Sequence, residues 1–151
     1  MTDDTNNYYE LRLKKSQKLK IALVCIPNIG HLVPIANLAE ALKEKGHSVT
    51  IISIGNKKGK MICPKLFDEK GIPYILTDGP EESVMYDNVE NNLDPSENYI
   101  KGWEKHAVSA INNMMPDLVV SDFGSRNGVI AADLIGIPCV INVNIPIAEF
   151  Y

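Results

Sequence analysis

The sequence predicts an α/β fold, a doubly wound parallel sheet of about five strands in the order 3-2-1-4-5 with helices on both faces. Three observations predict it. Short continuous apolar runs are typical of strands buried on both faces of a sheet. Apolar residues between these runs recur at helical spacing, and glycine or proline stands near the ends of the elements. Strands that alternate with helices in this way form a parallel, Rossmann-like sheet through right-handed crossovers.

The first unit, Lys20 to Ser53, reads as strand, turn, helix and strand. Ile21 to Ile26 is a continuous apolar run, and the proline, asparagine and glycine that follow it break the strand. We expect Pro34 in the first turn of the helix, where a missing backbone N–H is tolerated. The helix then ends at a glycine, and the β-branched run from Val49 to Ile54 forms the second strand.

The rest of the chain alternates in the same way between strand-like and helix-like segments. Trp103 and Met114 fall on one stripe of the longest predicted helix, so we expect both in the core. The acidic stretch from Thr77 to Asn98 is either a surface loop or a lid that faces the ligand. The predicted ranges are a helix over 61–70, a strand over 72–76, a helix over 99–115, a strand over 117–121, a helix over 128–135 and a strand over 139–143.

Length and composition indicate one soluble domain. The chain has 151 residues, of which 45% are hydrophobic and 23% charged, as is typical of a globular protein. Residues 1–18 are polar and are expected to be a disordered leader, and residues 19–151 are expected to form the domain. The net charge of −4 argues against a nucleic-acid partner, because binding phosphates takes clustered lysine and arginine. No apolar run approaches the roughly 20 residues of a transmembrane segment.

The cysteines indicate neither a metal site nor a disulfide framework. Cys25, Cys63 and Cys139 are far apart and include no C-x-x-C pair, and we expect Cys25 and Cys139 to be buried. Such a pattern suits a reducing compartment. The start of the chain has no apolar core, so it does not read as a secretory signal. We therefore expect a cytoplasmic protein without a bound metal.

His31 and Asp122 are two residues that could share one site. In the predicted strand order, strands 1 and 4 are neighbours and the winding reverses between them, which opens a crevice at their carboxyl ends. His31 follows strand 1 and Asp122 follows strand 4, so we expect them to face one another there. An imidazole can accept a proton near neutral pH, and a carboxylate on its second ring nitrogen fixes the tautomer. Such a pair could activate a hydroxyl, an amine or a thiol as a nucleophile.

These residues also have structural interpretations. A lone histidine in a turn is more often structural or solvated, and an aspartate after a strand often caps the next helix. His47 follows a helix end and His106 lies within a helix, so neither is placed at the crevice. The run from Gly124 to Gly128 could hold an anion with Arg126 assisting, or it could be a simple loop before a helix. Neither a G-x-G-x-x-G nor a G-x-x-x-x-G-K-[ST] phosphate loop follows the first strand.

At two places the sequence resembles the UDP-glycosyltransferase family. The segment PNIGHLVPIANLAEALKEKGHSVTIIS is similar to the family's opening, with a P-x-x-G-H-x-x-P turn, an L-A-x-x-L helix and a G-H-x-V-T strand start. The segment PDLVVSDFGSRNGVIAADLIGIPCVIN is similar to the family's fourth-strand region, with its D-x-x-x-x-x-G spacing and its G-I-P sequence. Together the two segments cover most of residues 20–143, in the order and at the distance that the family shows.

The resemblance implies the N-terminal, acceptor-binding half of an inverting GT-B glycosyltransferase. The family's general base matches His31, and the aspartate that balances its charge matches Asp122. The resemblance also implies a UDP-sugar as co-substrate, no further cofactor or metal, and a small hydroxylated acceptor that can be apolar in part. We expect the acceptor to contact four further residues: Asn28, Gly30, Phe123 and Asn144.

Nothing in the sequence matches the nucleotide-binding domain that forms the family's second half, so we expect the chain to be inactive alone. Three interpretations stay open. The chain could be a glycosyltransferase half, either truncated or completed by a separate donor-binding chain. It could be a non-catalytic module that binds a small molecule in the same crevice. It could also be an unrelated doubly wound nucleotide-binding domain.

Overall fold

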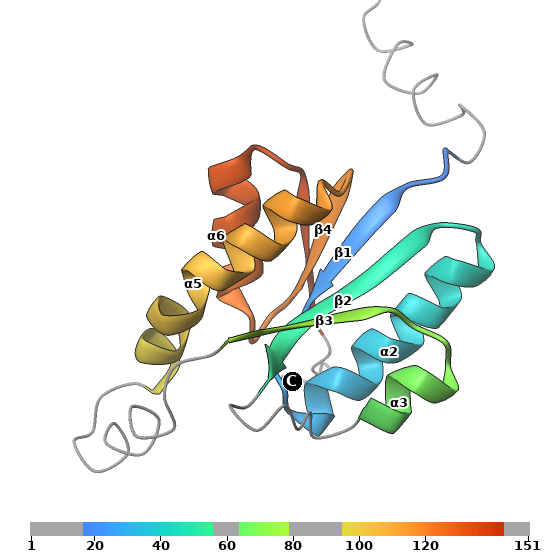
Figure 1. Cartoon of the computed structure of the whole chain (residues 1–151), viewed down its shortest axis with the longest axis horizontal. Coiled ribbons are helices and arrows are strands. Elements are labelled where there is room, and N and C mark those ends of the chain that lie inside the picture. Colours follow the sequence, from blue (N-terminus) through green and yellow to red (C-terminus); the bar gives the residue numbers. More distant parts are fainter. Residues whose placement is uncertain (1–16, 56–63, 79–94, 144–151) are drawn as a thin grey trace, which may run out of the picture.

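The computed structural model of the chain describes residues 17–55, 64–78 and 95–143 (Figure 1). Within them the strands form a five-stranded parallel sheet in the order β3-β2-β1-β4-β5, so the predicted doubly wound fold is confirmed. In chain order the elements are β1 (Lys20–Val24), α2 (Ile29–Glu44), β2 (Ser48–Gly55), α3 (Pro64–Glu69), β3 (Tyr74–Asp78), α5 (Pro95–Met114), β4 (Leu118–Asp122), α6 (Arg126–Ile135) and β5 (Cys139–Asn142).

β1 lies at the centre of the sheet, where the direction of winding reverses. Leu23 in β1 is in register with Ile51 in β2 on one side and with Val120 in β4 on the other. The connection from β1 to β2 runs through α2, and the connection from β4 to β5 runs through α6 on the opposite face (Figure 1). The carboxyl ends of β1 and β4 therefore meet at the switch point of the sheet, where α/β folds bind their ligands.

The sheet separates two apolar core layers. α2 and α3 cover one face of the sheet, and α5 and α6 cover the other (Figure 1). β1 contributes to both layers, because successive side chains of a strand point to opposite faces. This alternation explains why the strand reads as one continuous apolar run in the sequence. The residues of this run in the α2 layer are Ile21, Leu23 and Cys25, and those in the α5–α6 layer are Ala22 and Val24.

Trp103 anchors α5 in the second layer. Its side chain is fully buried, and its indole N–H donates a hydrogen bond to the hydroxyl of Thr77 in β3. Met114 is also buried, so the core positions predicted for this helix are confirmed. Cys25 is buried as predicted, whereas Cys139 is only partly buried because β5 is an edge strand of the sheet.

α2 begins earlier than the sequence predicted. Asn28 is its N-cap, and the side-chain oxygen of Asn28 accepts a hydrogen bond from the backbone N–H of Gly30 at 3.0 Å. The helix starts at Ile29, and Pro34 lies inside it rather than in its first turn. Pro34 removes only the hydrogen bond that would run to the carbonyl of Gly30, an exposed residue. As a consequence, His31 lies in the first turn of the helix and not in the preceding turn.

Other element boundaries differ from the prediction by a few residues. β3 begins at Tyr74 rather than Ile72, which leaves Pro73 before the strand. There the carbonyl of Pro73 still accepts a hydrogen bond from Ile51 at 2.9 Å, so the proline interrupts no pairing. Some predictions fall on residues outside the described ranges: residues 1–16 of the leader predicted over 1–18, Cys63, most of the acidic stretch from Thr77 to Asn98, and Asn144.

Candidate functional site

The first turn of α2 positions His31. The backbone N–H of His31 donates a hydrogen bond to the carbonyl of Asn28 at 2.9 Å, which fixes the residue at the start of the helix. His31 lies four residues before Ile35, which is buried against the sheet, and residues four apart share a helix face. The imidazole therefore faces the sheet, and only 20% of its side chain is exposed.

Asp122 ends β4, and the alternation of the strand turns its side chain toward α2. Val120 lies in the α2 core layer, whereas Val119 lies in the α5–α6 layer. Side chains two residues apart in a strand share a face, so Asp122 faces α2 as Val120 does. Asp122 is only 1% exposed, and a carboxylate buried to that extent needs hydrogen-bond donors around it.

The two side chains meet directly. The distance from Nδ1 of His31 to Oδ2 of Asp122 is 2.7 Å, and the same oxygen accepts the backbone N–H of Gly124 at 3.0 Å. An ionised carboxylate can only accept, so Nδ1 carries the ring proton. In the neutral imidazole Nε2 is then unprotonated and acts as the hydrogen-bond acceptor. The structure thus brings together the two residues that the topology predicted to face one another.

Phe123 packs against the imidazole. The ring centroids of His31 and Phe123 are 4.9 Å apart, and the ring planes are inclined by 35°. The backbone N–H of Phe123 donates a hydrogen bond to the carbonyl of Asn142 in β5 at 3.0 Å, which fixes the residue at the end of the sheet. The side chain of Phe123 is partly exposed, so an apolar surface borders the histidine.

Cys25 lies close enough to Asp122 to be influenced by its charge, but it does not supply a nucleophile. Burial raises the pKa of the Cys25 thiol far above its usual value, and the negative charge of Asp122 raises this pKa further. The thiol therefore stays protonated at neutral pH, and the reactive thiolate does not form. The carbonyl of Cys25 accepts a hydrogen bond from the hydroxyl of Ser53 at 2.7 Å. Cys25 thus belongs to the packing beneath the site.

The other residues that were predicted to contact the acceptor are Asn28, Gly30 and Asn144. Asn28 uses its side-chain oxygen to cap α2, and Gly30 is exposed in the first helical turn. Asn144 lies outside the described residues. Away from the pair, a ring nitrogen of His47 accepts a hydrogen bond from the backbone N–H of Leu19 at 3.2 Å, which is a structural role.

Gly124 is the residue at the site that sequence reasoning missed. The run from Gly124 to Gly128 reads as a simple loop or an anion-binding loop, but in the structure Gly124 lies against the pair. A Cβ at position 124 would lie 2.9 Å from Cε1 of His31 and 3.1 Å from Oδ2 of Asp122. The signal in the sequence is a glycine two residues after the aspartate. That spacing does not indicate which side chain fills the space beside the glycine.

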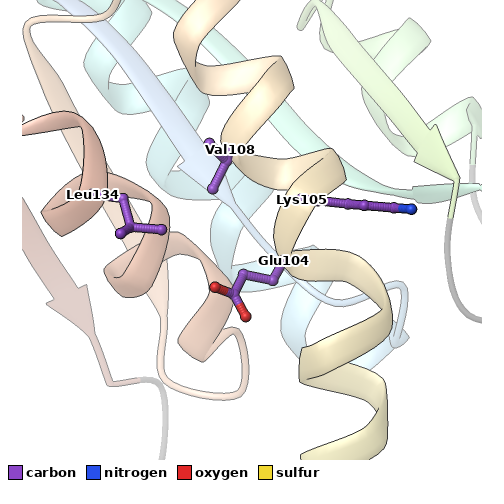
Figure 2. A pocket seen from close by; sticks show the side chains of 4 residues that line it. All are labelled: Glu104, Lys105, Val108 and Leu134. Atoms are coloured by element: carbon purple, nitrogen blue, oxygen red, sulfur yellow. The ribbon is translucent and has the colours of Figure 1, made fainter.

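A shallow pocket lies elsewhere, between α5 and α6. It has a volume of about 310 Å³ and is lined by Glu104, Lys105, Val108 and Leu134. Figure 2 shows Leu134 on α6 across from Val108 and Glu104 on α5, while Lys105 extends away from Leu134. This pocket lies on the α5–α6 side of the sheet, whereas the histidine–aspartate pair lies on the α2 side. The pocket and the pair are therefore separate features.

Neither a metal-ligand cluster nor a membrane-spanning helix occurs in the described part of the chain. Across residues 17–55, 64–78 and 95–143, no group of three or more histidine, cysteine, aspartate or glutamate side chains could hold a metal ion. Within the same ranges, every helix is too short or too polar to cross a bilayer.

The chain has a relative among curated proteins, although no protein-family model matches it. This relative is the UDP-N-acetylglucosamine--N-acetylmuramyl-(pentapeptide) pyrophosphoryl-undecaprenol N-acetylglucosamine transferase of Latilactobacillus sakei subsp. sakei (strain 23K). The two sequences are 26% identical over 117 residues, which are 75% of this chain and 31% of that protein.

Solved structures of sugar-transferring enzymes share the fold. The glycotransferase of kitacinnamycin matches with a TM-score of 0.67 at 20% identity, over 85% of this chain and 31% of that one. Phytolacca americana UGT2, solved with UDP-2-fluoro-glucose and pterostilbene, matches with a TM-score of 0.63 at 16% identity, over 85% of this chain and 31% of that one. The chain thus has the glycosyltransferase fold that its two motifs predicted, and it spans 31% of the length of each of these proteins.

Proposed function

We propose that this chain, which has the fold of the glycosyltransferases that it matches, is the acceptor-binding half of a sugar-transferring enzyme. His31 is the general base that deprotonates an acceptor hydroxyl, and Asp122 orients it. The observation that carries this proposal is the 2.7 Å hydrogen bond between Nδ1 of His31 and Oδ2 of Asp122. This bond holds the ring proton on Nδ1 and leaves Nε2 to receive a proton from the acceptor.

In the proposed reaction, the acceptor hydroxyl lies against Nε2 of His31. Its oxygen forms a bond with the anomeric carbon of the donor sugar, and the hydroxyl proton moves to Nε2. The bond between the anomeric carbon and the phosphate oxygen breaks on the opposite side, and the nucleoside diphosphate leaves with the bonding electrons. Attack on one side with departure from the other inverts the configuration of the anomeric carbon. No metal ion takes part in this proposed mechanism.

Asp122 stabilises the imidazolium that forms during the transfer. Its carboxylate is buried, so its attraction to a positive charge on His31 is weakly screened by water. The backbone N–H of Gly124 donates to the same carboxylate oxygen at 3.0 Å and holds the carboxylate in one orientation. The site therefore supplies both a proton acceptor and a fixed negative charge beside it.

The surface beside His31 supports an acceptor with an apolar or aromatic part. The side chain of Phe123 is 37% exposed, and its ring packs against the imidazole. A flat apolar molecule could stack on this ring while its hydroxyl reaches Nε2 of His31. Phytolacca americana UGT2 was solved with pterostilbene, a phenolic compound. We therefore propose a small hydroxylated acceptor, and a phenol is the first probe to use.

The proposed donor is a UDP-sugar. The Latilactobacillus relative is named for UDP-N-acetylglucosamine, and the Phytolacca structure contains UDP-2-fluoro-glucose. Because this chain spans 31% of each of these proteins, we propose that another domain or a separate chain binds the nucleotide-sugar. The described residues would then supply the acceptor side of a shared active site.

Acceptor binding can be tested on the chain itself by NMR titration, with pterostilbene in one experiment and UDP in another. We expect pterostilbene to shift the signals of His31 and Phe123, and we expect UDP to leave them unchanged. Phe123→Ala should weaken the binding of pterostilbene. Leu134→Ala is the control, because it removes an exposed apolar side chain from the α5–α6 pocket on the other face. Shifts of His31 with UDP alone would contradict the assignment and favour a nucleotide-binding domain.

Catalysis can be tested with His31→Ala in the chain combined with the domain or separate chain that binds the nucleotide-sugar. The rate of sugar transfer should fall by about 10²- to 10⁴-fold, the range that general bases contribute. The fold should remain intact, because Asn28 still caps α2 and the imidazole lies at the end of the core. His106→Ala, in α5, is the control and should keep the rate. A rate near that of the wild type in His31→Ala would exclude the general-base role. Acceptor binding without transfer would support the non-catalytic alternative.

A further inference from the structure

We propose that Gly124 is a positioning residue for His31, an inference that rests on the general-base function proposed above. The missing side chain of Gly124 leaves room for the imidazole. Its backbone N–H also holds the carboxylate of Asp122, which orients the ring. Gly124 would therefore act on the reaction through its neighbours, without contact to the reacting atoms.

The pair itself fills the space beside Gly124. A Cβ at position 124 would lie 2.9 Å from Cε1 of His31, 3.1 Å from Oδ2 of Asp122 and 3.1 Å from Cδ1 of Ile26. A Cβ is essentially never found as close as 2.9 Å to a ring carbon, so the imidazole would have to move. Phe123 packs against the same ring and limits the directions in which it can move.

The edge of the imidazole that faces Gly124 carries both of its proposed functions. Cε1 is bonded to Nδ1, which binds Asp122, and to Nε2, which would receive the proton from the acceptor. A side chain at position 124 would press on Cε1, the ring carbon between these two nitrogens. A shift of the ring away from position 124 would also strain the 2.7 Å hydrogen bond on which the tautomer depends.

The backbone of Gly124 adds a second constraint. Its N–H donates to Oδ2 of Asp122, the same oxygen that accepts from Nδ1 of His31. The tight turn after β4 fixes this geometry, because the backbone N–H of Ser125 donates to the carbonyl of Asp122 at 2.8 Å. The turn thus places one N–H on the carboxylate and, at the same residue, leaves out the side chain that would displace the ring.

The tautomer of His31 tests the proposal, and nitrogen NMR of the full chain without any ligand measures it. In the wild type at mildly alkaline pH, we expect the proton on Nδ1 and an unprotonated Nε2. In Gly124→Ala, we expect loss of this single tautomer and a shift of the ring signals. Ser125→Ala is the matched control, because the Ser125 hydroxyl has no hydrogen-bond partner among the described residues. This variant should keep the wild-type tautomer.

A second variant separates the contact of the added Cβ with Ile26 from its contact with the ring of His31. Ile26→Val removes Cδ1, so the combination of Ile26→Val with Gly124→Ala relieves the contact with Ile26 and retains the contact with the ring. We expect this double variant to be more stable than Gly124→Ala and to keep the altered tautomer. Recovery of the wild-type tautomer would show that Gly124 serves packing against Ile26, and it would overturn the proposal.

Hydrogen exchange keeps the proposal testable if both Gly124→Ala variants fail to fold. In the wild type we expect the amide of Gly124 to be protected by its hydrogen bond to Asp122, and Asp122→Ala should abolish that protection. Protection that survives in Asp122→Ala, or an unchanged tautomer in a folded Gly124→Ala, would overturn the proposal. These measurements need neither acceptor nor donor. The positioning role of Gly124 can therefore be confirmed even if the chain takes no part in sugar transfer, and it can be refuted even if sugar transfer is observed.

Discussion

The hydrogen bond between His31 and Asp122 has a direction, and one substitution can reverse it. In Asp122→Asn, an amide oxygen at the position of Oδ2 would keep the contacts with Gly124 and Nδ1 of His31, but the negative charge that stabilises the imidazolium would be lost. An amide nitrogen at that position would instead donate to Nδ1, and the ring proton would move to Nε2. A protonated Nε2 cannot receive the proton of an acceptor hydroxyl. We therefore expect the rate of sugar transfer to fall by about 10⁴-fold. The side chain keeps its shape, so the fold should remain.

Steady-state kinetics of transfer measures this effect, and nitrogen NMR reports the tautomer in the same variant. Asp133→Asn is the matched control, since it makes the same chemical change on an exposed residue of α6. It should leave both the rate and the tautomer unchanged. If Asp122→Asn retained more than about a tenth of the rate, a base held in one tautomer by Asp122 would be the wrong mechanism.

The thiol of Cys25 predicts a pH dependence of stability. Burial, and then the charge of Asp122, raises its pKa above the ordinary value of 9.0. Below pH 9.0 the thiol is protonated in the folded and the unfolded chain, so its contribution to stability is fully present. Above that pH the unfolded chain loses the proton and the folded chain keeps it, so stability falls. From pH 8 to pH 10, Cys25 should lower the free energy of unfolding by about 1.4 kcal/mol.

Urea unfolding of the wild type and of Cys25→Ala at both pH values measures this contribution. The variant should be less stable at either pH, because removing the buried sulfur leaves a cavity. Its stability should nevertheless change less between the two pH values, and the difference from the wild type isolates the thiol. Equal pH dependence in the two proteins would mean that Cys25 titrates alike in the folded and unfolded chains.

At the scale of elements, α6 packs tightly against the sheet at Gly128. A Cβ there would lie 2.5 Å from Oγ of Ser121 in β4 and 2.9 Å from Cβ of Val24 in β1. The Cβ of Val24 is fixed by the strand backbone and cannot rotate away, so the helix would have to move off the sheet. We expect Gly128→Ala to lower the free energy of unfolding by about 1–3 kcal/mol.

Gly30→Ala is the matched control for this measurement by urea denaturation. Gly30 also lies in the first turn of a helix, but a Cβ there would meet only Oδ1 of Asn28 at 3.4 Å, an ordinary contact. Alanine restricts the unfolded chain more than glycine does, so Gly30→Ala should leave stability unchanged or raise it by up to about 1 kcal/mol. Similar losses in both variants would contradict the close packing of α6 on the sheet.

At the scale of the whole molecule, the features that depend on topology could be predicted from the sequence. Apolar runs and helical stripes indicate an alternation of strands and helices, and only a few strand orders satisfy right-handed crossovers. The order then places the ends of β1 and β4 side by side. This is why His31 and Asp122, which are far apart in the sequence, could be expected at one site before any distance was known.

The features that depend on atomic packing could not be predicted in this way. Pro34 favours the first turn of a helix, but the cap supplied by Asn28 starts α2 a full turn earlier. The place of Gly124 against the imidazole depends on how the turn after β4 folds back, and the glycine alone does not encode that path. The contact of Phe123 with His31 likewise follows from the way this turn is fixed to β5.

The two core layers share one sheet, which makes their stability interdependent. β1 and β2 contribute alternate side chains to both layers, so loss of packing in one layer removes support from strands on which the other layer packs. Each layer also contains one residue that can report on its unfolding. Trp103, the single tryptophan of the chain, lies in the α5–α6 layer, and Cys25 lies in the α2 layer.

We therefore expect both layers to unfold in one transition. Tryptophan fluorescence in urea reports on Trp103. Labelling with a thiol reagent reports on Cys25 in a variant in which the other two cysteines are serine. The midpoints should coincide, because exposing Cys25 requires separation of α2 from the same strands that bury Trp103. Labelling at urea concentrations well below the fluorescence transition would show that α2 leaves the sheet independently. His31 would then lie on an element that detaches before the rest of the domain unfolds.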